Sequence, residues 1–203
     1  MKSILKPVEH ELVIKKSTFI AYVYPVAFSK DIDHILSALR TKYPDASHHC
    51  FAYVLGEQGD QQKADDDGEP SQTAGMPILE VLKKQGLTDL LCVVIRYYGG
   101  IKLGAGGLVR AYAKSTSEAL KKATYATRVK MLTLQINTTF PLLGSVESYL
   151  RSVCDISDII YEDTVTFVVE VKEADYPMIE SRIRDLTSGA SYPDIIREYN
   201  QYQ

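Results

Sequence analysis

The chain has 203 residues, of which 45% are hydrophobic and 24% charged, and its formal net charge is −3. This composition is typical of soluble globular domains and excludes disordered and fibrous proteins, and the length suits one or two domains. No apolar run approaches the ~18–20 residues that a membrane helix needs, and residues 1–7 lack the apolar core of a secretory signal. Three scattered cysteines exclude a disulfide scaffold, so we expect a cytoplasmic protein without a membrane partner.

Charge is distributed unevenly along the chain. Residues 1–130 contain 18 Lys and Arg against 14 Asp and Glu, whereas residues 131–203 contain 5 against 12. Residues 96–130 are the most basic stretch, because Glu118 is their only acidic residue. A basic stretch of this kind indicates an anionic partner, and it is also the pattern of a solvated helix face.

The first part of the chain alternates strand and helix patterns. Runs of β-branched and aromatic residues predict strands, and apolar residues at helical spacing, such as Ile32, Ile35 and Leu39, predict helices. In chain order we expect a strand over residues 19–26, a helix over 29–39, a strand over 50–55, a helix over 77–84, a strand over 90–97 and a helix over 107–123. The polar segment 56–75 predicts a long loop, and such loops in compact domains are usually functional.

Residues 131–203 show a second pattern. We expect a strand over residues 131–139, a helix over 141–153, a hairpin of strands 156–161 and 164–172, a helix over 174–186 and a strand over 192–199. The order β-α-β-β-α-β is that of ferredoxin-like domains. The sequence therefore predicts an α+β protein with one domain over residues 1–130 and a ferredoxin-like domain over residues 131–203.

A glycine-rich loop follows the strand over residues 90–97 and opens the next helix. Backbone N–H groups at a helix N-terminus attract anions, and glycines such as Gly104 and Gly106 let a phosphate approach closely. The loop matches neither the Walker A motif nor the dinucleotide-binding motif. Because Arg96, Lys102 and Arg110 are nearby, we interpret it as a surface for an anion such as an RNA phosphate. The structural alternative is that the glycines permit tight packing of strand against helix.

Two tyrosines, Tyr97 and Tyr98, stand at the start of this loop. Aromatic rings beside a basic surface can stack on unpaired bases. Such tyrosines also commonly pack with only the hydroxyl in water, and the sequence contains no RNA-recognition motif. Both interpretations stay open.

An acidic cluster, Asp66, Asp67 and Glu69, lies within the expected long loop. Several carboxylates around a glycine could hold Mg²⁺ or perform acid–base work. Alternatively, the aspartates cap turns or pair with the basic loop. We expect His48 to point toward this cluster, and Cys50, which begins an apolar strand, to be buried and inert. No catalytic residue, metal or cofactor is assigned from these patterns.

Several segments of residues 15–115 together resemble the YigZ/IMPACT family, in the family's order. They are Phe19-Ile-Ala, His48-His-Cys-Phe-Ala-Tyr53, Asp66-Asp-Gly-Glu-Pro70, Thr73-Ala-Gly-Met-Pro-Ile-Leu79 and Arg96-Tyr-Tyr-Gly-Gly-Ile-Lys-Leu-Gly104. The last segment is the most specific signature. Gln72 departs from the pattern, in which we expect glycine, and it adds a side chain beside the candidate site.

The resemblance implies an N-terminal domain with the fold of ribosomal protein S5 domain 2, followed by a small ferredoxin-like domain. It also implies a role in translation, because eukaryotic IMPACT proteins are implicated in translational control. We therefore expect a binding protein whose partner is RNA, the ribosome or a ribosome-associated protein. A small phosphate-binding enzyme that uses the acidic cluster with Mg²⁺ and a protein–protein docking module are the alternatives. The family motif matches His48, Asp66, Asp67, Glu69, Arg96, Lys102 and Arg110.

Overall fold

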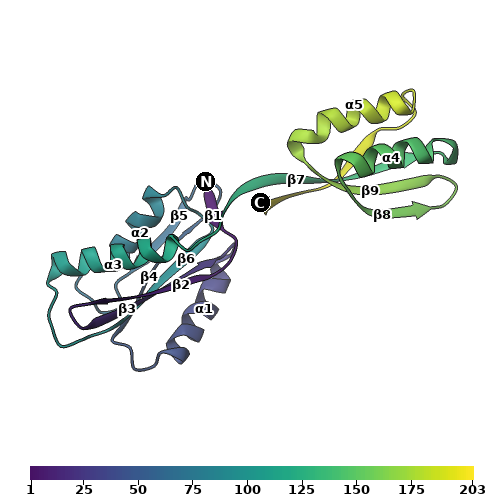
Figure 1. The fold of residues 1–203 in the computed structure, drawn as a ribbon. Coiled ribbons are helices and arrows are strands. Elements are labelled where there is room, and N and C mark those ends of the chain that lie inside the picture. The colour runs from purple at the N-terminus through teal and green to yellow at the C-terminus, as the bar shows by residue number, and fades with distance from the viewer. The chain divides into compact units, whose positions relative to one another are not determined.

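The computed structural model describes all 203 residues and divides them into two compact units. The first unit is Met1–Thr127 with Gln203, and the second is Arg128–Tyr202. Each unit combines a β-sheet with helices, so the chain is a two-unit α+β protein (Figure 1). None of its helices combines the length and the apolar character that a membrane crossing requires.

The first unit is built on a five-stranded antiparallel sheet in the order β2-β3-β6-β4-β5. The strands are β2 (Val8–Ile14), β3 (Ser17–Pro25), β4 (His48–Leu55), β5 (Gln61–Asp65) and β6 (Leu90–Tyr97). The central strand β6 is buried along nearly its whole length, as its continuous apolar run predicts. A short strand, β1 (Lys2–Ile4), pairs with the start of β7 rather than with this sheet.

Helices cover both faces of this sheet (Figure 1). On one face, α2 (Gly75–Lys84) and α3 (Ala105–Leu120) bury Ile78 and Tyr112 against the strands. On the other face, α1 (Ser29–Lys42) buries Ile32. The helices therefore exclude solvent from both faces of β6. The polar residues at its end lie on a strand that is packed on both sides.

Three strands, β1, β2 and β5, were not predicted from the sequence patterns. β5 lies inside segment 56–75, so the expectation of one long loop there is wrong. It is an edge strand that pairs only with β4, and its residues are exposed or half-buried. It therefore lacks the apolar alternation by which strands are recognised.

The second unit follows the expected order β-α-β-β-α-β. Its elements are β7 (Tyr125–Thr138), α4 (Leu143–Val153), β8 (Asp155–Tyr161), β9 (Val165–Lys172), α5 (Tyr176–Leu186) and β10 (Pro193–Tyr202), with one-turn 3₁₀ helices before α4 and α5. The strands form an antiparallel sheet in the order β10-β7-β9-β8. Val146, Phe167 and Ile183 belong to its separate core. β7 begins six residues ahead of the expected residue 131.

Candidate anion-binding site

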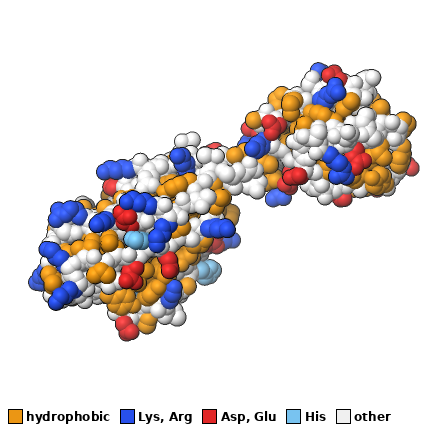
Figure 2. All heavy atoms as spheres, in the orientation of Figure 1, with side chains coloured by type: hydrophobic (Ala, Val, Ile, Leu, Met, Phe, Trp, Pro, Cys, Tyr) orange, Lys and Arg blue, Asp and Glu red, His pale blue; other side chains and the backbone are white.

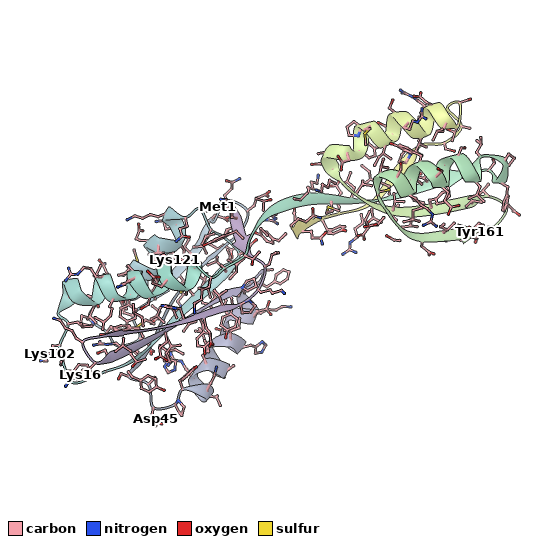
Figure 3. The ribbon with its side chains drawn as sticks, in the orientation of Figure 1. Met1, Lys16, Asp45, Lys102, Lys121 and Tyr161 are labelled. Atoms are coloured by element: carbon pink, nitrogen blue, oxygen red, sulfur yellow. The ribbon has the colours of Figure 1, made fainter.

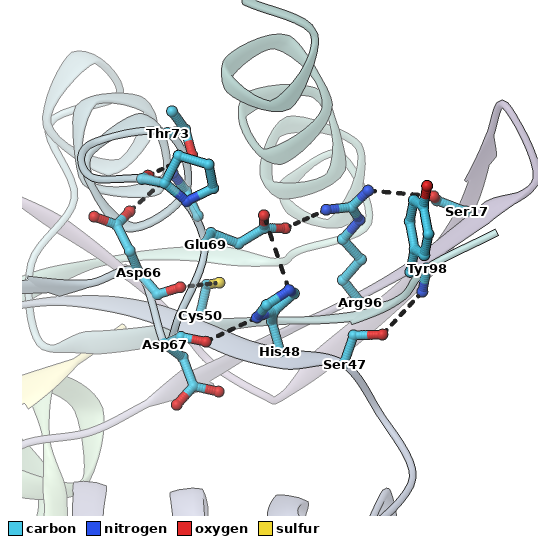
Figure 4. Close-up of polar contacts among 12 residues, drawn as sticks. Ser17, Ser47, His48, Cys50, Asp66, Asp67, Glu69, Thr73, Arg96 and Tyr98 are labelled. Atoms are coloured by element: carbon cyan, nitrogen blue, oxygen red, sulfur yellow. Dashed lines mark hydrogen bonds and ion pairs between the residues drawn. The ribbon is translucent and has the colours of Figure 1, made fainter. Parts of the chain in front are cut away.

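A buried polar network lies where β4, β6 and the turn after β5 meet (Figure 4). His48 at the start of β4 stands opposite Arg96 near the end of β6 in the strand register, so the sheet brings the two together. Arg96 forms an ion pair with Glu69, and the Tyr112 hydroxyl donates a hydrogen bond to the same Glu69 oxygen at 2.8 Å. His48 Nε2 lies 3.9 Å from the other Glu69 oxygen.

The side chains of Glu69 and Arg96 are only 4% and 6% exposed. A buried ion pair needs both partners, since removing one leaves an uncompensated charge. The Arg96 guanidinium also lies 5.4 Å from the ring centres of both Phe19 and Tyr98. Arg96 is therefore a buried, paired cation and not the exposed basic residue that the sequence interpretation assumed. A direct role in nucleic-acid binding stays a prediction for it.

Asp66 is a cap for helix α2. Its carboxylate accepts hydrogen bonds from the backbone N–H groups of Gln72, Ala74 and Gly75 at 2.7–2.9 Å. These groups lie at and just before the first turn of α2, where N–H groups lack partners within the helix. The turn-capping alternative therefore describes Asp66.

Asp67 is directed to the other side of the turn. Its carboxylate accepts hydrogen bonds from the His49 backbone N–H at 2.6 Å and from Arg40 at 2.8 Å. Burial alone would raise the pKa of this carboxyl, but those hydrogen bonds and the Arg40 charge outweigh burial and lower it. No group of three or more His, Cys, Asp and Glu side chains is arranged to hold a metal ion. Asp66 and Asp67 thus have different partners on different sides of the turn, and Mg²⁺ binding by the acidic cluster stays an alternative from the sequence alone.

His48 points toward the acidic turn, as expected, because its Nδ1 lies 2.8 Å from the Asp67 carbonyl oxygen. Cys50 is fully buried, and its thiol donates to the Asp66 carbonyl oxygen at 3.0 Å. Burial raises the pKa of the Cys50 thiol to about 12. Because the thiolate is the nucleophilic form, Cys50 is unsuited to catalysis near neutral pH.

A cleft of about 420 Å³ separates Glu69 and Pro70 from the glycine loop. Its far wall is the start of α3, whose first intrahelical hydrogen bond runs from Leu108 N–H to the Gly104 carbonyl at 2.9 Å. The α3 N-terminus has no side-chain cap and no acidic residue in its first turn. The partial positive charge of the helix end therefore faces the cleft. The lining residues are Glu69, Pro70, Arg96, Tyr98, Lys102, Leu103, Gly104, Ala105 and Leu108.

The structure separates some of the residues that the sequence placed together. Tyr97 packs against the core on the α1 side, whereas Tyr98 lines the cleft and is 48% exposed. Successive strand residues face opposite sides of a sheet, so Tyr97 points away from the cleft. Arg110 lines a neighbouring hollow rather than the cleft, and a side chain at Gly106 would meet only Arg110, at 3.5 Å.

Two lysines that the sequence interpretation missed join the glycine loop. Lys15 and Lys16 form the tip of the β2–β3 hairpin, and this tip packs so closely on Gly99 that a Cβ there would lie 2.0 Å from the Lys16 carbonyl carbon. The sequence pattern that could have identified them is a Lys-Lys pair between two runs of strand-forming residues. Figure 3 shows Lys16 and Lys102 at the same end of the unit. We define the basic cluster as Lys15, Lys16, Lys102, Arg110 and Lys114.

All five side chains of the basic cluster are exposed. None of them lies within ion-pair distance of a carboxylate in this structure. In Figure 2, Lys and Arg side chains gather at this end of the first unit. Unpaired surface cations that converge from separate elements give a local positive potential.

Comparison with known proteins identifies the family. Residues 15–120 match the Impact N-terminal domain, and residues 136–190 match a domain of unknown function, DUF1949. The chain belongs to the IMPACT family. It is 43% identical over 184 residues to the IMPACT family member YvyE of Bacillus subtilis, covering 90% of this chain and 85% of that protein. Identity to the IMPACT family member YigZ of Escherichia coli is 35%, over 87% and 88%.

More distant relatives and a solved structure agree with this assignment to the IMPACT family. The human Protein IMPACT is 35% identical over 107 residues, which are 49% of this chain and 33% of that protein. A crystal structure described as that of a hypothetical protein is 32% identical, has a TM-score of 0.65 and covers 97% of both chains. The family resemblance stated from the sequence motifs is therefore confirmed.

Gln72, the departure from the family pattern, has a structural explanation. Its φ of +61° lies in the left-handed region that favours glycine. Its side chain lines a separate hollow with Met76 and Val109 and is not part of the cleft wall. The Gln72 side chain therefore does not obstruct the cleft. The energetic cost of its left-handed backbone conformation falls on the turn alone.

Proposed function

We propose that this chain is a cytoplasmic binding protein of the translation machinery that holds RNA or the ribosome through its basic cluster. The observation that carries the proposal is the convergence of five unpaired cations from the β2–β3 turn, the glycine loop and α3. Membership of the IMPACT family supports the link to translation. The acidic excess in residues 131–203 favours a nucleic-acid contact confined to the first unit.

We also propose finer fold assignments, with domains over residues 1–130 and 131–203. The first has the fold of ribosomal protein S5 domain 2, and the second is ferredoxin-like. The strand order β10-β7-β9-β8, with α4 and α5 contributing to one core, supports the second assignment. The family resemblance supports the first.

Co-sedimentation with ribosomes across a salt series tests the function. Wild-type association should fall steeply with salt, because phosphate contacts release counterions. Lys102→Glu should weaken binding and reduce the log–log salt slope by about 1. The matched control is Lys84→Glu, which makes the same charge change at an exposed site in the last turn of α2 and should behave as wild type.

Two results would contradict the proposal: no association at low salt, or equal losses in Lys102→Glu and Lys84→Glu. Association that depends on neither salt nor Lys102 would instead assign the partner to the class of ribosome-associated proteins. That result would favour the docking-module alternative.

A further inference from the structure

The cleft beside the basic cluster offers hydrogen-bond donors that converge on one place. The first turn of α3 presents N–H groups at Ala105 and the residues after it, without a capping side chain. Lys102 lines the same cleft and is exposed. Backbone donors at a helix N-terminus together with a nearby cation form the usual environment of a protein-bound phosphate.

Arg96 provides a second and independent sign of a ligand in the cleft. Its side chain lines the cleft and is 6% exposed. A guanidinium has five N–H donors, and only two of them have partners, Glu69 and Ser17. Nε is buried without any hydrogen-bond partner. Because Nε is closed to solvent, the two remaining terminal N–H groups of Arg96 are the donors that an acceptor in the cleft could reach, and buried donors are normally satisfied.

The opposite side of the cleft has a different chemistry. One Glu69 oxygen is occupied by Arg96 and Tyr112, whereas the other lies 3.9 Å from His48 Nε2 and accepts no hydrogen bond from the protein. The Tyr98 ring, 48% exposed, forms part of the wall. A bare inorganic anion would use only the α3 side, so a ligand that fits the whole cleft has an anionic group, a hydrogen-bond donor and a flat ring.

From these features we infer that the cleft is a binding site for one nucleotide. Its phosphate lies at the first turn of α3 beside Lys102, its base stacks on Tyr98, and a sugar hydroxyl or base N–H group donates to Glu69. A volume of about 420 Å³ lies within the range of small-ligand sites. The inference deepens the proposed function and rests on it for one source of the nucleotide, an RNA strand held by the basic cluster. A free mononucleotide is the other source.

Titration calorimetry on the full chain tests the chemistry with three probes: 5′-AMP, adenosine and ribose 5-phosphate. AMP should bind at least about tenfold more tightly than adenosine, because adenosine has no phosphate to accept the charge-assisted hydrogen bonds. AMP should also bind roughly tenfold more tightly than ribose 5-phosphate, because stacking on Tyr98 is lost. Adenosine binding as tightly as AMP would overturn the placement of the phosphate.

A pair of variants at Ala105 separates binding from folding. Ala105→Asp places a carboxylate at the α3 N-terminus, which stabilises the helix but repels a phosphate. We expect its melting temperature to be unchanged or higher, while AMP affinity falls at least about tenfold. Ala105→Asn has nearly the same shape without the charge and should stay within about threefold of wild type. Equal AMP affinities in the two variants would overturn the inference.

The source of the nucleotide is distinguished by a single-stranded tetra-adenylate with a 5′-phosphate. Tighter binding of the tetranucleotide than of AMP identifies a nucleotide within RNA, and the reverse identifies a free nucleotide. If neither binds, the inference is wrong.

Comparison with the ribosome sedimentation keeps the two proposals distinguishable. AMP binding without ribosome association would leave the cleft site standing and overturn the proposed function. Salt-dependent ribosome association without AMP or tetranucleotide binding would support the proposed function and overturn the nucleotide site in the cleft. Lys84→Glu serves as the unaffected control in both measurements.

Discussion

Glu69, Arg96 and Tyr112 hold the floor of the cleft by reciprocal contacts. The Tyr112 hydroxyl and the Arg96 guanidinium share one Glu69 oxygen, and burial raises the pKa of the Tyr112 phenol far above its usual range. Tyr112 therefore remains a donor at any physiological pH. Each of these groups is stable in the interior because the others satisfy it.

Asp67 gives a pH-dependent prediction at the residue scale. Because the folded-state pKa of Asp67 lies below its ordinary value of 3.8, ionised Asp67 stabilises the fold at neutral pH, and this contribution is lost as pH falls through the lowered pKa. Asp67→Asn should reduce the free energy of unfolding by ~1–2 kcal/mol at pH 7. The deficit should shrink below about pH 4.

Urea denaturation at several pH values measures this effect. Asp45→Asn, which changes an exposed carboxylate in the same unit, is the control and should leave stability nearly unchanged. A deficit that stays constant or grows on acidification would refute the assignment.

At the scale of elements, the glycines of the loop differ in whether neighbouring backbone requires them. Gly99 allows the β2–β3 hairpin tip to lie directly on the loop, because a Cβ there would overlap the Lys16 backbone. Gly106, the second residue of α3, has no comparable neighbour. The packing alternative considered from the sequence therefore describes Gly99 but not Gly106.

Substitution of these two glycines by alanine should have opposite effects on stability. Gly99→Ala should destabilise the protein by ~2–3 kcal/mol, because the hairpin tip must move. Gly106→Ala should stabilise it by up to ~0.5–1 kcal/mol, because alanine favours the helical conformation. Chemical denaturation measures both, and two effects of the same sign would contradict this division of roles.

At the scale of the whole molecule, the chain has separate hydrophobic cores. The first unit has a core on each face of its sheet, and the second has one between its sheet and helices. Charge follows a similar division, since acidic residues dominate residues 131–203. Independent cores favour independent unfolding transitions.

Phe167→Ala tests the independence of the cores. Phe167 is fully buried in the core of the second unit, and its truncation should cost ~3–5 kcal/mol. Calorimetry should show one transition moving to lower temperature while the other stays in place. Ribosome association through the basic cluster should persist. Phe167→Leu, which retains most of the volume, should shift the same transition less, and a single transition that moves as a whole would contradict the prediction.

Much of the element order could be predicted from the sequence, because its causes are local. The continuous apolar run of β6 predicted a strand buried on both faces, and its bounds, Leu90–Tyr97, are those expected. All five α-helices were predicted, with ends that differ by two or three residues. Helical spacing indicated α1, whereas Pro77 and Gly86 marked the ends of α2. The strands β1, β2 and β5 were missed, and β5 has no buried residue and no apolar alternation by which a strand is recognised.

Tertiary structure alone decided the composition of the candidate site. The strand order β2-β3-β6-β4-β5 sets His48 beside Arg96 and carries Lys15 and Lys16 to the glycine loop. Spacing along the chain does not predict these strand pairings, because residues far apart in sequence come together only when the sheet forms. Local chemistry thus indicated which residues are candidates for anion binding, whereas long-range strand pairing determined which of them meet, and made Arg96 a buried partner of Glu69.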